Sequence, residues 1–374
     1  MAPGSRGDTF EERRHLVIVP SWIEDESLYS WCCRWHRHTL NRTRTTGVAL
    51  FGVSSAAKVW NAPNPFGWFD HVTMGLLGTP RSILKSRTVA GSYLALAHPV
   101  DRQCVEFGEL PPAYLFSAKS GINTSLRYCE KCAEGHFALY GVAIWRITHQ
   151  LPGVYVCVEH GQPLIDYPNN RQIWTLPSSR SSSEIQTISQ KELESMLVVA
   201  EVARIIFNCN DVEIGMLRNG ARKVLCEAYG ALDARRLDPE VVERDWRGST
   251  LGKWSDRTMV GAKAFSRLWL TNLIRGRRSE RNPTRWAFAI AYFSEQSWIS
   301  IDGFFENTSA AQSSQLSLWV DSDKVPSQVL KAFEAAANIG QVSEMLGFSV
   351  STVRRWMCSH PDLAVISRHW TFRR

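Results

Sequence analysis

Two short segments of the chain carry residue pairs that bind metals. Residues 129–132 (CEKC) and 157–160 (CVEH) each place two thiol or imidazole groups with two residues between them. Zinc takes four such ligands at a tetrahedral centre, and this spacing lets one tight turn direct both side chains at the same ion. The 24 residues between the two pairs are enough for the second to return to the first. The sequence predicts one structural zinc ion, with the ligands Cys129, Cys132, Cys157 and His160.

These residues have other interpretations. A single CxxC can be a redox pair, but that function needs a thioredoxin-like βαβ context, which this region lacks. Chance placement of buried thiols is a second alternative. His136 and His149 lack the paired spacing and are interpreted as surface or core histidines. Because four protein ligands leave no coordination position open for water, the expected ion contributes stability rather than catalysis.

A second pattern, over residues 339–356, predicts a helix-turn-helix. Val342, Met345 and Leu346 form one apolar face, and Gly347 supplies the left-handed turn between two helices. Arginine and hydroxyl side chains on the second helix suit contacts with DNA bases and phosphates. The alternative is a helical hairpin that packs on the body or binds protein. The residues expected to contact DNA are Ser349, Ser351, Thr352, Arg354 and Arg355.

A basic stretch over residues 267–285 carries six arginines against the single acid Glu280, with Trp269 and Trp286 among them. One interpretation is a solvated helix face whose tryptophans belong to the core. The other is a surface that contacts DNA phosphates, in keeping with a formal net charge of +7. The candidate phosphate contacts are Arg275, Arg277, Arg278, Arg281 and Arg285.

Helices must position these groups. Ser27 begins a helix that extends to about Leu40, because apolar residues recur there at the helical period. Serine and glutamate at 189 and 192 predict a capping box at the start of another helix. Further short helices are expected around 70–77, 80–88 and 90–97, a turn-rich module at 126–166, and helices over 191–300 with a loop near 245–256.

The fold class expected is mainly α, a helical N-terminal part with an inserted zinc-ribbon or knuckle module, a helical middle domain and a C-terminal helix-turn-helix. Stretches rich in serine and other polar residues mark the linkers. The expected organisation is a disordered N-terminus (1–15), a first domain (16–177) that contains the zinc module (126–166), a Ser-rich linker (178–190), a helical domain (191–305), and a linker with the helix-turn-helix (306–374).

Composition and missing motifs exclude several classes of protein. No stretch of 18 apolar residues predicts a membrane span, and charges stand where a signal peptide needs its apolar run, so a cytoplasmic protein is expected. No GxxxxGK[ST] phosphate loop and no HxE…PCxxC deaminase signature occurs. Outside the predicted zinc site no cysteine stands in an activating motif. We therefore expect a protein without enzymatic activity.

Three segments together resemble the TniQ family of transposition proteins. They are PSWIEDESLYSW (20–31), RYCEKC (127–132) and WRITHQLPGVYVCVEHGQPL (145–164), and the resemblance covers roughly residues 16–168. A weaker similarity to helical repeats of the longer TnsD-type relatives lies at 282–293. Many relatives carry a second cysteine-rich knuckle, but residues 165–172 contain no cysteine, so one zinc ion per chain is expected.

This resemblance implies a target-site selection factor for a DNA transposon. Such a factor binds double-stranded DNA at the insertion site and recruits an AAA+ transposition ATPase of the TnsC or TniB type. The alternative is an adaptor that docks onto an RNA-guided CRISPR effector complex and links it to the ATPase. A homodimer belongs with this second interpretation.

Overall fold

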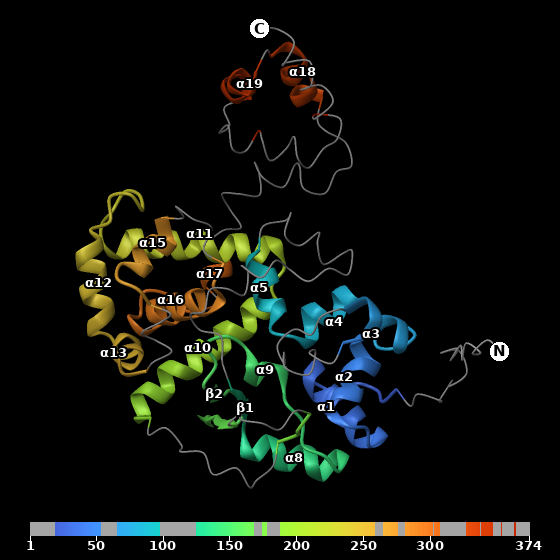
Figure 1. Ribbon diagram of the computed structural model, residues 1–374. Helices are drawn as coiled ribbons and strands as arrows, with labels where there is room; N and C mark the ends of the chain where they lie inside the picture. The colour runs from blue at the N-terminus through green and yellow to red at the C-terminus, as the bar shows by residue number, and fades with distance from the viewer. Residues whose placement is uncertain are drawn as a thin grey trace, which may run out of the picture. The chain divides into compact units, whose positions relative to one another are not determined.

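The structure is a computed structural model, and it describes residues 19–53, 66–97, 125–167, 174–177, 188–258, 265–275, 281–301, 303–306, 327–336, 338–346, 353 and 363. The described chain is mainly α-helical, with two small two-stranded sheets. It divides into two compact units, residues 1–306 and 307–374. Figure 1 shows α1 to α4 on one side of the first unit and α12, α13, α15 and α16 on the other, with α10 between them.

The N-terminal helices confirm most of the local predictions. Helix α1 begins after Ser27, whose Oγ accepts a hydrogen bond from the Ser30 N–H at 3.2 Å. Its stripe of Leu28, Trp31 and Trp35 is buried, as the helical period predicted. The helices of this region are α1 (Leu28–Thr39), α2 (Thr43–Phe51), α3 (Phe66–Val72), α4 (Pro80–Arg87) and α5 (Ala90–Leu96).

A buried ion pair holds the entrance to α1. The carboxylate of Glu26 is fully buried and accepts hydrogen bonds from the Arg34 guanidinium at 2.6 and 2.7 Å. Arg34 also donates to the Ser21 carbonyl at 2.7 Å. Since a buried charge is tolerated when it is paired and hydrogen-bonded, this pair fixes the segment before α1 against the helix.

Residues 126–167 form a module whose two ends are joined by a sheet. Strand β1 (Leu126–Tyr128) pairs antiparallel with β4 (Ile165–Tyr167), and β2 (Val156–Cys157) pairs with β3 (Gln162–Pro163). Between them lie α8 (Glu130–Tyr140) and α9 (Ile147–Gln150). The 11-residue helix α8 was not predicted, because Gly135 and the exposed side chains of its second half give no amphipathic period.

Most of the remaining first unit is helical, and one expectation was wrong. The predicted loop near 245–256 is two helices, α12 and α13, which Ser249 separates. Ser249 ends α12 and caps α13, since its Oγ accepts from the Gly252 N–H at 2.9 Å. The capping box of Ser189 and Glu192 is confirmed. The helices are α10 (Gln190–Asn208), α11 (Asp211–Ala228), α12 (Pro239–Gly248), α13 (Thr250–Arg257), α15 (Trp269–Arg275), α16 (Pro283–Glu295) and α17 (Gly303–Glu306).

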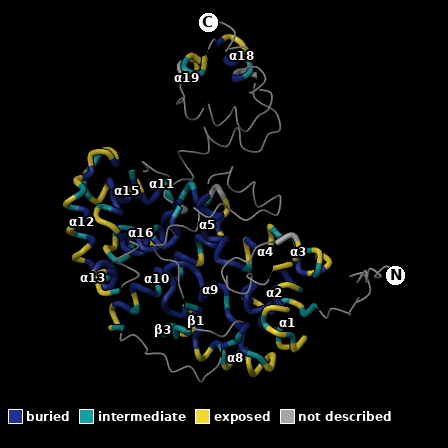
Figure 2. Tube along the Cα trace, viewed as in Figure 1, coloured by how far each residue is buried: buried dark blue, intermediate teal, exposed yellow. Residues whose placement is uncertain are grey.

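One large hydrophobic core connects the module to these helices. Leu151 and Val156 of the module, Val199 and Ile206 of α10, and Phe288 of α16 belong to the same buried cluster. Figure 2 shows buried residues along α10 and α16 at the centre of the unit. Packing of its apolar side chains in this core therefore anchors the metal-binding module to α10 and α16.

The second unit contains α18 (Ser327–Ala335) and α19 (Ile339–Leu346). Phe333, Val342, Val353 and Leu363 contribute to a small core of its own. Helix α19 coincides with the first helix of the predicted helix-turn-helix. Met345, expected on the apolar face, is 58% exposed. The predicted second helix lies outside the described residues apart from Val353, so the helix-turn-helix stays a prediction.

Candidate metal centre

The four predicted ligands converge on one point. Cys129 precedes the first turn of α8 and Cys132 lies within that turn, Cys157 ends β2, and His160 lies in the turn between β2 and β3. Their ligand atoms all lie within 4.8 Å of one another, and the three cysteines are buried. A helix start and a β-turn thus bring together residues that are 31 positions apart at most.

The distances suit a tetrahedral ion. With metal–sulfur bonds of about 2.3 Å and metal–nitrogen bonds of about 2.0–2.1 Å, tetrahedral ligands lie about 3.8 Å apart for two sulfurs and about 3.6 Å apart for sulfur and nitrogen. The Sγ atoms of Cys132 and Cys157 are 3.7 Å apart. His160 Nδ1 lies 3.5 Å from Cys129 Sγ, 3.2 Å from Cys132 Sγ and 3.6 Å from Cys157 Sγ. The cluster could therefore hold one metal ion.

Polar groups around the cluster favour ionised sulfurs. Gln162 Nε2 donates to Cys129 Sγ at 3.0 Å, and Arg146 Nη1 donates to Cys132 Sγ at 3.2 Å. Hydrogen bonds among the three sulfurs lower the pKa of the Cys129 thiol and raise the pKa of the Cys132 and Cys157 thiols. Since metals bind thiolates rather than thiols, a bound cation would ionise the remaining two sulfurs, and the donors Gln162 and Arg146 would stabilise their charge.

The two other histidines of the module lie outside the cluster. His149 is buried on α9 with its Nε2 3.9 Å from Cys132 Sγ, and burial lowers its pKa to about 3. It is therefore neutral at physiological pH. His136 lies one turn beyond Cys132 on α8, and burial also lowers its pKa. Neither belongs to the group of four converging ligands.

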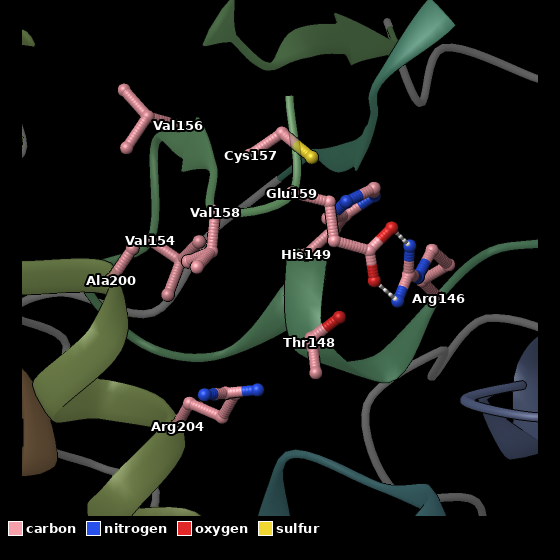
Figure 3. A pocket seen from close by; sticks show the side chains of 10 residues that line it. All are labelled: Arg146, Thr148, His149, Val154, Val156, Cys157, Val158, Glu159, Ala200 and Arg204. Carbon is pink, nitrogen blue, oxygen red and sulfur yellow. Dashed lines mark hydrogen bonds and ion pairs between the residues drawn. The ribbon is translucent and has the colours of Figure 1, made fainter. Parts of the chain in front are cut away.

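Arg146 connects the metal cluster to its surroundings. Besides Cys132, its guanidinium contacts the carboxylates of Asp25 and Glu159. Figure 3 shows the Glu159 carboxylate facing the Arg146 guanidinium. Hydrogen bonds from Arg146 lower the pKa of Glu159. Sequence reasoning missed this role; its only signal was the position of Arg146 within the quoted segment 145–164.

A pocket lies between the module and α10 (Figure 3). Its charged groups are paired within the protein, Arg146 with Glu159 and Arg204 with Glu201 at 2.6 Å. The Thr148 hydroxyl is hydrogen-bonded to Asp25. The residues around the pocket come from the module and from α10. The pocket is lined by Arg146, Thr148, His149, Val154, Val156, Cys157, Val158, Glu159, Ala200 and Arg204.

Of the predicted DNA contacts, Arg275, Arg281 and Arg285 lie in the described residues. Arg275 donates to the carbonyls of Ala234 at 3.1 Å and Leu237 at 2.7 Å, so its guanidinium holds a turn of the fold. Trp269 and Trp286 are buried, as the core interpretation expected. Arg281 and Arg285 are half-buried and interact with other protein groups. The remaining predicted contacts lie outside the described residues: Arg277, Arg278, Ser349, Ser351, Thr352, Arg354 and Arg355.

Comparison with protein-family models gives a match. Residues 17–164 match the family model TniQ, a segment that ends four residues beyond His160 and so includes all four ligands. A search of curated proteins finds no match. Among the described residues no helix is long and apolar enough to cross a membrane.

Proposed function

Since residues 17–164 match the TniQ family of transposition proteins, we propose that the chain selects the site at which a DNA transposon inserts. In this function it binds double-stranded DNA at the site and recruits an AAA+ transposition ATPase of the TnsC or TniB type, without catalysis of its own. The observation that carries the proposal is the family match together with the metal cluster inside it. A formal net charge of +7 supports an anionic partner.

The proposed metal is one structural zinc ion on Cys129, Cys132, Cys157 and His160. Three thiolates and one imidazole are soft and borderline ligands, a set that favours zinc over the harder magnesium and calcium ions. The protein supplies all four coordination positions, so no position is open for a catalytic water and the ion stabilises the module. Its function in target selection is to hold the surface that the module presents.

The proposed DNA-reading elements are the C-terminal helix-turn-helix and the basic stretch around 275–285. Arg354 and Arg355 remain the proposed base and phosphate contacts of the second helix, with Ser349, Ser351 and Thr352 beside them. The bonds that Arg275 makes to backbone carbonyls argue against a direct phosphate contact by that residue.

The test is selection of DNA by the purified, zinc-loaded protein from a random duplex library at near-physiological salt. Salt matters because phosphate binding without sequence preference is strong at low ionic strength. Enrichment of a sequence motif is the expected result, and the Arg354→Ala/Arg355→Ala variant should lose it. Failure of the folded protein to enrich any motif would contradict DNA-site selection by this chain.

One feature favours the second candidate, an adaptor between an RNA-guided CRISPR effector and the ATPase. The end of α8 exposes three large apolar side chains, Phe137 at 64%, Leu139 at 76% and Tyr140 at 49%. Large apolar side chains that are exposed close to one another are typical of protein interfaces. Co-purification with a CRISPR effector, together with a dimeric mass in solution and no enriched DNA motif, would favour the adaptor.

A further inference from the structure

The turn between α1 and α2 carries a positively charged surface, which we call the α1–α2 surface and define by Arg37, Arg42 and Arg44. All three side chains are exposed. None of the three makes an ion pair with another described residue, in contrast to Arg34 one turn earlier, which pairs with Glu26. Three positive charges within eight residues therefore face solvent without an ion-pair partner in the part of the chain that the structure describes.

The backbone beneath these arginines is held in place. His36 Nδ1 lies 2.6 Å from Thr46 Oγ1, which joins the end of α1 to the start of α2. Leu40 takes the left-handed conformation with φ 51° and closes α1 through its N–H to the His36 carbonyl at 3.1 Å. The Thr43 carbonyl accepts from Trp174 Nε1 at 3.1 Å. The arginines thus extend from a fixed turn, so a ligand need not order the backbone on binding.

The sequence that forms this surface contains no acidic residue. No aspartate or glutamate occurs between Glu26 and Asp70 in the sequence. The nearest preceding acids are already occupied, Glu26 by Arg34 and Asp25 by Arg146. On α4, Lys85 is also exposed. Arg37, Arg42 and Arg44 therefore stand in a stretch of sequence without acids, and the two nearest preceding carboxylates already pair with other arginines.

We infer that the α1–α2 surface binds the phosphate backbone of duplex DNA, in addition to any contact made by the C-terminal unit. Arginine presents a planar fork of donors that matches phosphate oxygens, and arginine, hydroxyl and amide groups make most protein contacts to DNA phosphates. Thr39 and Thr45 are exposed beside the arginines and Asn41 is half-buried. This inference rests on the proposed DNA-binding function and assigns part of it to the TniQ domain itself.

The experiment measures binding of the full-length, zinc-loaded protein to a fluorescent duplex of unselected sequence over a series of salt concentrations. The test variant is Arg37→Gln/Arg42→Gln/Arg44→Gln. The control Lys191→Gln/Lys223→Gln/Lys253→Gln removes the same charge from exposed positions of the helical half. A third variant, Arg37→Lys/Arg42→Lys/Arg44→Lys, keeps the positive charge at the three substituted positions. If it binds DNA while the glutamine variant does not, the loss of affinity comes from the charge and not from misfolding.

The expected result is a loss of affinity of tenfold or more for the glutamine test variant, with a salt slope lower by about 2–3, since each phosphate contact contributes about 0.9. The lysine variant should keep most of the slope, and the control should keep wild-type binding. Equal binding by test variant and control would overturn this surface and leave DNA-site selection standing. Absence of DNA binding by the wild type would overturn both. Unchanged DNA binding with lost ATPase recruitment would assign the surface to a protein partner and overturn the inference.

Discussion

Asp25 and Arg146 are 121 residues apart in the chain, and the Arg146 Nε lies 2.6 Å from Asp25 Oδ2. The Asp25 carbonyl also accepts from the Ile147 N–H at 2.8 Å, and Asp25 has a left-handed φ of 56°. The same guanidinium donates to the metal-cluster sulfur of Cys132. One side chain therefore ties the segment that precedes α1 to the metal centre.

Replacement of Arg146 with lysine should weaken both connections. One amine cannot reproduce the fork of contacts to Asp25, Glu159 and Cys132, and the Asp25 side chain is only 14% exposed. We expect a loss of about 2–4 kcal/mol in the free energy of unfolding, near the range for breaking buried pairs. Zinc affinity should fall about 10–100-fold, as for other residues that orient metal ligands. Urea unfolding and competition with a chelator measure the two effects.

The control for that change is Arg204→Lys, which alters a more exposed ion pair whose arginine side chain is 51% accessible. It should cost less than about 1 kcal/mol. If Arg146→Lys and Arg204→Lys had equal effects, the connecting role of Arg146 would be wrong.

Loss of a ligand should unfold the metal module. Cys129→Ser removes one thiolate from the cluster, and in small zinc modules the bound ion contributes folding free energy on the order of 10 kcal/mol. The melting temperature should fall sharply and the zinc content measured by elemental analysis should drop from one ion per chain. Cys226→Ser is the matched control, because this buried cysteine lies outside the cluster and its variant should keep its zinc. A wild-type protein without zinc, and an unchanged melting temperature in Cys129→Ser, would contradict the metal assignment.

Two glycines should respond oppositely to alanine. A Cβ at Gly91 would lie 2.0 Å from the Lys85 carbonyl oxygen and 2.6 Å from the Phe207 ring, where α5 meets α10. Gly91→Ala should cost at least about 1–3 kcal/mol through overpacking. Gly135 on α8 has nothing within 4 Å of such a Cβ, so Gly135→Ala should stabilise by up to about 0.5–1 kcal/mol through helix propensity. Thermal unfolding of both variants checks the contrast, and a tolerated Gly91→Ala would refute the close packing.

Stability should fall at high pH. Burial raises the pKa of the phenols of Tyr29, Tyr93 and Tyr229, and raises the pKa of Tyr292 to about 12. Since an exposed phenol in the unfolded chain ionises near pH 10, each contributes stability that is complete below about pH 10 and decreases as the pH rises toward the folded-state pKa. The expected slope is about 1.4 kcal/mol per pH unit and phenol.

Urea unfolding at pH 9, 10 and 11 measures this slope, and phenolate absorbance reports ionisation. The variant Tyr292→Phe should show a shallower decrease than the wild type. Phenolate absorbance from all nine tyrosines in the still-folded protein at pH 10.5 would show that these phenols are not protected.

The sequence alone determined features that depend on short spacing. Two residues between metal ligands, the cap at Ser27 with its apolar stripe, and the capping box at Ser189 are each specified within one or two helical turns, and the structure contains all three. The family resemblance also rests on short segments, which occur in the sequence in the expected order. Residues 17–164 match the family.

Only the tertiary structure decided which polar groups meet across the fold. Nothing in the sequence indicated that Arg146 would contact Asp25. The guanidinium of Arg275, which the sequence predicted to contact phosphate, donates to carbonyls of the turn at 234–237. Arg34 and Arg37 look equivalent in the sequence, yet one is buried against Glu26 and the other faces solvent. The physical reason is that the ion-pair partner of a charged side chain depends on which groups the packed fold places beside it. That packing is determined by contacts between residues far apart in the chain.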